Sequence, residues 1–257
     1  MEEGARVKLL AVAGDKRREY FVTVRKKAVY STIAGPVKGE SILDSGYGSR
    51  IDTLRGSIYV LKPTWLEELE NWGRRGTQVI YPKDSAYMAI RAGLRHGSRV
   101  FEAGLGSGFL SASILSIICP GGKLYGYEVR REFYENTLYN IRSIGLEECV
   151  EAYNVDVVEG LEDLDNESLE AGFLDLPRPE NVLGEAWRVL KPSSPLVVFL
   201  PTVSQIERLV SSLDEDKWIV ESVEELLLRG WEAKPDAFRP LPRMIGHTGF
   251  LVFLRRL

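Results

Sequence analysis

Glu102-Ala103-Gly104-Leu105-Gly106-Ser107-Gly108 is the stretch that decides the fold. It follows a short apolar run and precedes a longer one, which predicts a turn from a strand into a helix. Glycines at such a turn let the backbone pass close to a ligand at the carboxyl edge of a parallel sheet. The third glycine comes one residue too early for the dinucleotide pattern Gly-x-Gly-x-x-Gly. The spacing therefore disfavours a pyrophosphate cofactor and a dehydrogenase.

Outward from this loop, strand and helix patterns alternate from about residue 80 to the end of the chain. Alternating patterns of this kind predict an α/β fold with a doubly wound, seven-stranded and mostly parallel sheet that has late antiparallel strands. The expected strands are 98–102, 123–128, 149–154, 170–175, 195–200, 218–227 and 249–254, and the expected helices are 84–94, 108–118, 131–144, 179–190 and 203–212.

The first part of the chain has a different pattern. Short apolar alternations at 7–12, 20–24 and 57–61 predict a small N-terminal β domain, with a hairpin tip at 14–18. Residues 1–75 carry 14 basic and 10 acidic side chains, whereas residues 76–257 carry 19 and 27. We therefore place the domain boundary between 1–75 and 76–257, and only the first domain has a basic excess.

Composition sets further limits. The 257 residues are 44% apolar and 27% charged, with a formal net charge of −4, so no overall basic field indicates nucleic acid. No apolar run approaches the roughly 20 residues of a membrane span, and we expect a cytoplasmic protein. The two histidines and two cysteines form no ligand-spaced cluster, so no metal is expected. A reduced chain is the favoured interpretation, although Cys119 and Cys149 are able to oxidise if the fold brings them together.

With an acid at its start, the glycine loop resembles the first motif of class I S-adenosylmethionine-dependent methyltransferases. The resemblance implies S-adenosyl-L-methionine as cofactor, held by residues 102–108. Glu128 ends the second strand, 20 positions after Gly108, which suits a carboxylate that binds ribose hydroxyls. Asp156 follows the third strand, where this class commonly binds the adenine amino group. A helix cap is the alternative role for Asp156.

Four segments resemble a narrower family, the TrmI-like tRNA (adenine-N1)-methyltransferases of archaeal type. The resemblance implies 1-methyladenosine formation in the tRNA T-loop at position 58, and also at 57 in archaeal members. It further implies tRNA as partner and a homotetramer. The segments are Thr77-Gln78-Val79-Ile80-Tyr81-Pro82-Lys83-Asp84, Glu102 to Gly108, Leu174-Asp175-Leu176-Pro177, and Met244-Ile245-Gly246-His247-Thr248-Gly249-Phe250-Leu251.

This resemblance assigns roles to individual residues. Asp175 is expected to accept a hydrogen bond from the adenine amine beside the transferable methyl group, which would orient N1 and stabilise developing positive charge. Tyr81 would line the pocket of a flipped-out base, or else be an aromatic packed at the domain boundary. His247 would approach the substrate, or else be an ordinary loop histidine. Gln78 and Ser107 are expected cofactor contacts.

Basic side chains suggest where RNA would bind. The N-terminal domain would present an RNA-facing surface, and three further residues outside it are candidates for phosphate contacts. The first group is Lys16, Arg17, Arg18, Arg25, Lys26 and Lys27, and the second is Lys83, Arg239 and Arg243.

Two other functions share part of this pattern. Protein-isoaspartate or small-molecule methyltransferases have the same glycine loop and core, but they do not need a basic β domain. A non-catalytic RNA-binding subunit would be expected to have a degraded glycine loop, whereas the loop here is intact. The intact loop therefore favours a catalytic subunit.

Overall fold

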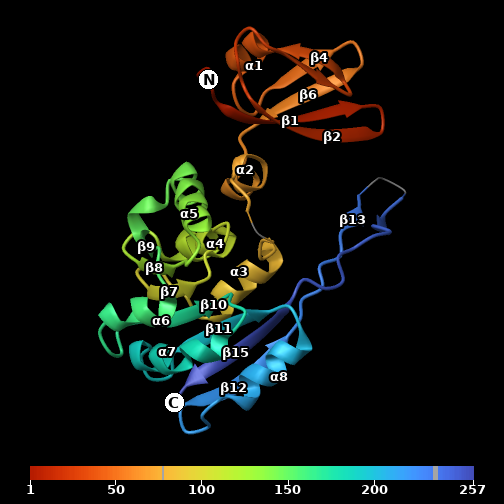
Figure 1. The fold of residues 1–257 in the computed structure, drawn as a ribbon. Coiled ribbons are helices and arrows are strands. Elements are labelled where there is room, and N and C mark those ends of the chain that lie inside the picture. The colour runs from red at the N-terminus through yellow and green to blue at the C-terminus, as the bar shows by residue number, and fades with distance from the viewer. Residues whose placement is uncertain (77, 234–236) are drawn as a thin grey trace. The chain divides into compact units, whose positions relative to one another are not determined.

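The computed structural model describes residues 1–76, 78–233 and 237–257 (Figure 1). Thr77 of the first family segment lies outside the described residues. The chain forms two compact units, Met1–Gly73 and Arg74–Leu257. The division falls two residues before the boundary expected from the sequence.

The first unit is built on an antiparallel sheet in the order β2-β1-β6-β5. Its buried side chains alternate along the strands, as expected for a sheet with one covered face. The turn between β1 and β2 is only Gly14-Asp15, so the expected hairpin tip is shorter and its three basic residues are paired in β2. The elements are β1 (Arg6–Ala13), β2 (Lys16–Thr23), β3 (Val29–Thr32), β4 (Gly35–Lys38), α1 (Gly39–Ser45), β5 (Arg50–Thr53), β6 (Gly56–Leu61) and α2 (Trp65–Trp72).

Helix α2 closes this unit and has the sequence signals of a helix start. The Thr64 side chain accepts a hydrogen bond from the Glu67 backbone, and the Glu67 side chain accepts one from the Thr64 backbone. This capping box satisfies two amides that a helix start leaves unpaired. Glu67 also binds Lys8 of β1 at 2.6 Å, which attaches α2 to the sheet.

The second unit contains a seven-stranded sheet in the order β12-β15-β11-β10-β7-β8-β9. In this sheet β15 alone runs in the direction opposite to the other strands, because it is antiparallel to both β11 and β12. One late strand is therefore antiparallel, where the sequence predicted more than one. Reversal of strand order on the two sides of β7 and β10 makes the sheet doubly wound. The strands are β7 (Arg99–Ala103), β8 (Lys123–Tyr127), β9 (Val150–Tyr153), β10 (Ala171–Leu174), β11 (Pro195–Leu200), β12 (Trp218–Glu224) and β15 (Phe250–Arg256).

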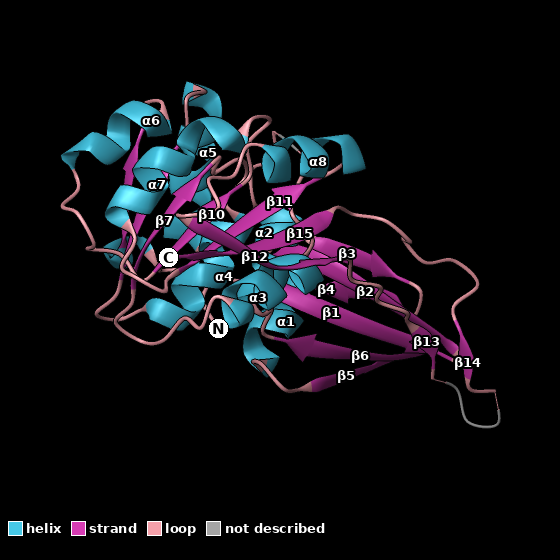
Figure 2. Cartoon of the chain, turned by 90° about the horizontal axis from the view of Figure 1, so that it is seen from below, coloured by secondary structure: helices cyan, strands magenta, loops and turns pink. Residues whose placement is uncertain are grey.

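Helices cover both faces of this sheet. Figure 2 shows α4 on the opposite side of the sheet from α6 and α7. The interval expected as one helix at 179–190 begins as a 3-10 turn at Pro179–Val182 before α7. The helical elements are α3 (Pro82–Arg91), α4 (Phe109–Ile118), α5 (Arg131–Ser143), η1 (Glu147–Cys149), α6 (Val157–Gly160), η2 (Leu161–Asp163), η3 (Pro179–Val182), α7 (Leu183–Val189) and α8 (Val203–Ser211). Two short antiparallel strands, β13 (Trp231–Glu232) and β14 (Arg239–Pro240), form a separate two-stranded ribbon.

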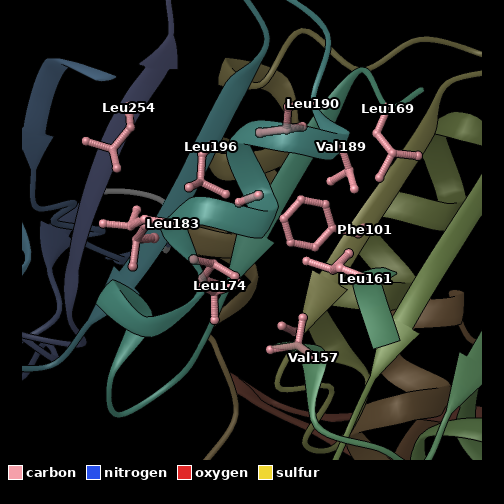
Figure 3. Close-up of a cluster of buried hydrophobic side chains, with 14 of the residues drawn as sticks. Phe101, Val157, Leu161, Leu169, Leu174, Leu183, Val189, Leu190, Leu196 and Leu254 are labelled. Carbon is pink, nitrogen blue, oxygen red and sulfur yellow. The ribbon is translucent and has the colours of Figure 1, made fainter. Parts of the chain in front are cut away.

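A hydrophobic core fills the space between the sheet and the helices α6 and α7. Figure 3 shows Phe101 of β7 facing Leu161 and Val189, with Leu174 and Leu196 on the neighbouring strands. All five side chains are fully buried. This packing fixes the carboxyl ends of β7 and β10, where the functional residues follow.

Cys119 and Cys149 form a disulfide, with their Cα atoms 6.0 Å apart. The preference for a reduced chain was therefore wrong. Cys119 follows α4 and Cys149 precedes β9, so the two residues meet because neighbouring parallel strands bring these connections together. Residue spacing alone does not determine such a meeting.

Candidate active site

The glycine loop and Asp175 lie against each other at the carboxyl ends of β7 and β10. Gly104 has φ +87°, and a Cβ atom on it would stand 2.2 Å from the Asp175 carbonyl oxygen. The Asp175 amide donates to the Ala103 carbonyl at 2.9 Å. Glycine is required here because both its backbone conformation and the close approach exclude a side chain.

Three adjoining cavities lie along this edge, with volumes of about 340, 400 and 20 Å³. All three share Gly104, and the two large ones also share Glu128. Together these cavities form one trough, which extends from α6 to the start of α4. The predicted site residues that line at least one of them are Gln78, Glu102, Gly104, Leu105, Gly106, Ser107, Glu128, Asp156 and Asp175.

Gly108 is the one predicted cofactor residue that lines none of these three cavities. It is the N-cap of α4 with φ +75°. A Cβ atom on it would stand 3.1 Å from the Thr137 side chain of α5. Its place in the structure is therefore that of a close helix-packing glycine.

Glu102 is completely buried at the end of β7. No described residue forms a hydrogen bond to either of its carboxylate oxygens. Burial raises the pKa of Glu102 to about 8. The polar groups of the neighbouring Ser111 reduce this increase, but the Ser111 hydroxyl does not form a hydrogen bond with the carboxylate. The negative charges of Asp175 and Glu128 raise the pKa further. A ligand with N–H donors or positive charge would supply what this carboxyl group lacks.

Glu128 is held in position by backbone groups. It is 6% exposed and accepts hydrogen bonds from the Gly106 amide at 3.2 Å and the Arg130 amide at 2.9 Å. Asn154 donates to the Glu128 carbonyl at 2.7 Å. These contacts orient the carboxylate toward the trough, where ribose binding was predicted.

Asp175 is partly buried and lines two of the cavities. Burial, together with the charge of Glu128, raises its pKa to about 6. A carboxylate with this pKa is ionised near neutral pH and still accepts a hydrogen bond strongly. Asp175 therefore combines exposure to the trough with a perturbed pKa, which is typical of functional carboxylates.

Asp156 is a helix cap, which is one of the two roles considered for it, and it also lines the trough. Its side chain caps α6 by accepting a hydrogen bond from the Val158 amide at 3.0 Å, and it also lines the 340 Å³ cavity together with Glu128. Ser107 is nearly buried, and its carbonyl accepts a hydrogen bond from Asn140 at 2.9 Å. The Ser107 hydroxyl accepts a hydrogen bond from the Gly76 amide at 3.4 Å. The start of α4 is thus attached to α5 and to the segment before α3.

Tyr81 and His247 do not line any of the three cavities. Tyr81 is the N-cap of α3 and is half-buried. The His247 ring contacts Glu225 and the carbonyl of Pro201, which lines the 400 Å³ cavity. The hydrogen bond to Glu225 raises the pKa of His247. His247 thus contacts the trough only through the Pro201 carbonyl, and neither His247 nor Tyr81 lines a cavity that Asp175 lines.

Sequence reasoning missed a buried cluster that joins two of the family segments. Lys83 binds Asp84 at 2.7 Å, and Thr248 donates to the other oxygen of Asp84 at 2.7 Å. Lys83 also donates to Thr248 at 2.7 Å. Asp84 is fully buried, so Lys83 is a structural ion-pair partner rather than the expected phosphate contact. Only their presence in the two family-specific segments could have drawn attention to these residues.

The trough fits S-adenosylmethionine. This cofactor has a sulfonium cation and an ammonium group but no phosphate, and the trough presents three acids, Glu102, Glu128 and Asp175. The unpaired oxygens of Glu102 and the close backbone approach at Gly104 both suit such a ligand. Among the described residues, no group of three or more metal-binding side chains was found. The described helices also include none long and apolar enough to cross a membrane.

The fold and the site together define a class I S-adenosylmethionine-dependent methyltransferase. Residues 56–241 match the family described as the tRNA methyltransferase complex GCD14 subunit. The chain belongs to this family, which includes the TrmI proteins.

Three relatives illustrate the similarity. The chain is 33% identical over 242 residues to the tRNA (adenine(58)-N(1))-methyltransferase TrmI of Thermus thermophilus, with 94% of each chain covered. It is 28% identical over 265 residues to the tRNA (adenine(57)-N(1)/adenine(58)-N(1))-methyltransferase TrmI of Methanocaldococcus jannaschii, covering 94% and 93%. The crystal structure of tRNA (m1A58) methyltransferase TrmI from Aquifex aeolicus superposes with a TM-score of 0.87 at 30% identity, covering 100% of this chain and 98% of that one.

Proposed function

We propose that this protein transfers a methyl group from S-adenosylmethionine to N1 of an adenine in the tRNA T-loop, at position 58. The observation that carries the proposal is the position of Asp175, whose ionisable carboxyl group lies against the glycine loop and lines the trough. The named activities of the TrmI relatives support the choice of acceptor.

The chemistry requires positioning more than a strong base. Adenine N1 already has a lone pair, and S-adenosylmethionine supplies an electrophilic methyl group when it is bound. Asp175 accepts a hydrogen bond from the exocyclic amine, which orients N1 and stabilises the positive charge that develops on the ring. Its pKa of about 6 leaves it ionised for this role at neutral pH.

The other acids hold the cofactor. Glu128 is held by two backbone amides, which supports its proposed role as acceptor of hydrogen bonds from the ribose hydroxyls. Asp156 lines the same cavity, which supports its proposed role in binding the adenine amine. Glu102 and the backbone of residues 104–107 complete the methionine end of the trough.

The proposal is tested with purified protein, labelled S-adenosylmethionine and two unmodified tRNA transcripts, one intact and one with guanine at position 58. Labelled 1-methyladenosine after digestion of the intact tRNA, and its loss from the substituted tRNA, is the expected result. A third transcript substituted at position 57 measures whether that adenine is also methylated, as in the archaeal relative. Equal labelling of all transcripts at another nucleoside would contradict the proposed acceptor.

A matched pair of variants separates the two parts of the site. Asp175→Asn removes the charge that acts on the acceptor, and we expect turnover to fall at least about 100-fold with little change in cofactor affinity. Glu128→Gln acts on the cofactor and is expected to weaken its binding. Loss of cofactor binding in Asp175→Asn would contradict this division of roles.

The basic N-terminal unit is the proposed RNA-facing domain. Lys16, Arg17 and Arg18 are exposed on β2, and Lys26 and Lys27 are exposed after it. If they bind phosphates, each substitution by Gln reduces the dependence of tRNA affinity on salt concentration by about one phosphate contact. An unchanged salt dependence of tRNA affinity in these variants would show that this basic surface does not bind tRNA phosphates.

We further propose a cytoplasmic homotetramer. Support for self-association comes from exposed apolar side chains on β12 and the adjoining ribbon, among them Ile219, Val223, Trp231 and Phe238. Light scattering is expected to give four times the chain mass of 28.9 kDa. A monomer across the concentrations used for catalysis would refute the assembly.

A further inference from the structure

The order of the strands in the sheet sets the order of the groups that line the 400 Å³ cavity. Glu128 follows β8 and the glycine loop follows β7, whereas Asp175 follows β10 and Gln205 follows β11. These four strands are neighbours, and neighbouring strands lie roughly 4.8 Å apart. The proposed cofactor residues are therefore on one side of Asp175, and Gln205 is on its other side. A base that reaches Asp175 from the side away from the cofactor meets Gln205.

Helix α8, which carries Gln205, is attached to the loop that follows Asp175. Arg208 donates to the Pro177 carbonyl at 2.7 Å and forms an ion pair with Glu180 at 2.7 Å. Gln205 lies three positions before Arg208 on α8, and side chains three positions apart are neighbours on a helix surface. The part of α8 that contains Gln205 is therefore held beside Asp175 and its loop.

The Gln205 amide has one group occupied and one available. Gln205 is half-buried, and its side-chain oxygen accepts a hydrogen bond from the Thr202 hydroxyl at 2.7 Å. Its NH2 group forms no hydrogen bond with any described residue. Because an amide NH2 group has two N–H donors, Gln205 offers hydrogen-bond donors to a molecule in the cavity that it lines.

Two other described side chains with N–H donors line this cavity, and both lie toward the cofactor. Gln78 also lines the 20 Å³ cavity at the glycine loop. The Arg130 guanidinium lies 4.3 Å from the centre of the Phe133 ring, and the Arg130 amide binds Glu128 at 2.9 Å. Gln205 is thus the side-chain donor on the acceptor side of Asp175.

Asp175 alone does not select adenine. It accepts a hydrogen bond from an exocyclic amine beside a nucleophilic ring nitrogen, and cytosine has the same pair of groups in its N4 amine and N3. Adenine differs because N7, a ring nitrogen that accepts hydrogen bonds, lies on the other side of its amine. A donor placed beyond Asp175 distinguishes the two bases, since cytosine has only a C–H group at the corresponding place.

We propose that Gln205 donates a hydrogen bond to N7 of the acceptor adenine. The inference rests on the proposed methylation of a tRNA adenine and adds a residue that recognises the base. When N1 faces the methyl group and the amine faces Asp175, N7 is the acceptor beside the amine, whereas N3 lies next to the ribose of the same nucleotide. The Thr202 hydroxyl is a positioning group, because it holds the Gln205 oxygen and so orients the amide.

Methylation of three tRNAs tests this contact. They carry adenine, 7-deazaadenine or 3-deazaadenine at position 58, and kcat/KM is measured for the wild type and for Gln205→Met, which is similar in size and has no N–H donor. We expect Gln205→Met to lower kcat/KM for the adenine tRNA about tenfold, without a change in cofactor affinity. The adenine-to-7-deazaadenine ratio is expected to be about tenfold smaller in the variant than in the wild type, since both changes remove the same hydrogen bond. The adenine-to-3-deazaadenine ratio is expected to be equal in the two proteins.

Glu207→Gln is the matched control, because Glu207 is an exposed residue of α8 that does not line the cavity. It is expected to leave both ratios unchanged. Equal adenine-to-7-deazaadenine ratios in the wild type and Gln205→Met, or a change in the 3-deazaadenine ratio instead, would overturn the proposal while leaving the proposed function intact. Absence of 1-methyladenosine from the adenine tRNA with the wild type would refute the proposed function as well. If Gln205→Met does not fold, Gln205→Glu, which also lacks an N–H donor, takes its place in the same comparison.

Discussion

Replacing Asp175 by Asn is expected to stabilise the protein while inactivating it. The folded protein raises the pKa of Asp175 from 3.8 to about 6, mainly by burial. The folded state therefore binds this proton more tightly than the unfolded state, and the free energy of unfolding falls as pH rises from 3.8 through 6. At 1.36 kcal/mol per pKa unit, the complete loss is about 3 kcal/mol. Asparagine is neutral at every pH, so the variant does not undergo this loss of unfolding free energy as the pH rises.

Urea denaturation of both proteins measures this difference. Between about pH 4.5 and about pH 7.5, the stability of Asp175→Asn relative to the wild type is expected to rise by about 2 kcal/mol. Methyl transfer to tRNA by the wild type is expected to decline below a midpoint near pH 6, because only the ionised carboxylate accepts the hydrogen bond. A constant stability difference across this pH range would refute the assignment of a buried, charge-perturbed carboxyl group.

Three further perturbations have expected outcomes. Replacing Cys119 and Cys149 by serine opens a loop of 30 residues and is expected to cost about 3–4 kcal/mol of unfolding free energy, an effect that reductant should reproduce in the wild type. Gly104→Ala places a methyl group 2.2 Å from the Asp175 carbonyl oxygen, and we expect calorimetry to detect no cofactor binding by this variant. Gly145→Ala is the control, because Gly145 has a similar φ of +73° but open space around it. Asp84→Asn leaves a largely buried lysine ammonium without its carboxylate, and a loss of about 3 kcal/mol or more in urea denaturation is expected. A change below about 1 kcal/mol would mean that water replaces the lost ion pair.

Local sequence patterns were sufficient for the architecture of the second unit. The apolar runs predicted strands that the structure places within about one to three residues, because a strand buried on both faces needs a continuous apolar run. The glycine loop also followed from local pattern, since the turn from β7 into α4 needs backbone conformations that only glycine adopts easily. The expected fold class and cofactor agree with the comparisons.

Elements with weak local signals were not predicted. Helix α1, strands β3 and β4, and the short helix α6 lack a long apolar period, and their positions depend on packing within their own unit. The acceptor was inferred from resemblance, because no pattern of charge or spacing distinguishes an adenine from another methyl acceptor.

The sequence by itself determined the alternation of strands and helices, the glycine loop, and the acids that end the strands, because these depend on neighbouring residues. Only the tertiary structure decided that Lys83 pairs with Asp84 and Thr248, that His247 faces Glu225, and that the two cysteines are bonded. The physical reason is that the contacts to Thr248, the His247–Glu225 contact and the disulfide join residues that are distant in the chain, and that burial by these distant segments forces the neighbours Lys83 and Asp84 to pair. Their geometry, burial and pKa values are set by the packing of the whole sheet rather than by any local pattern.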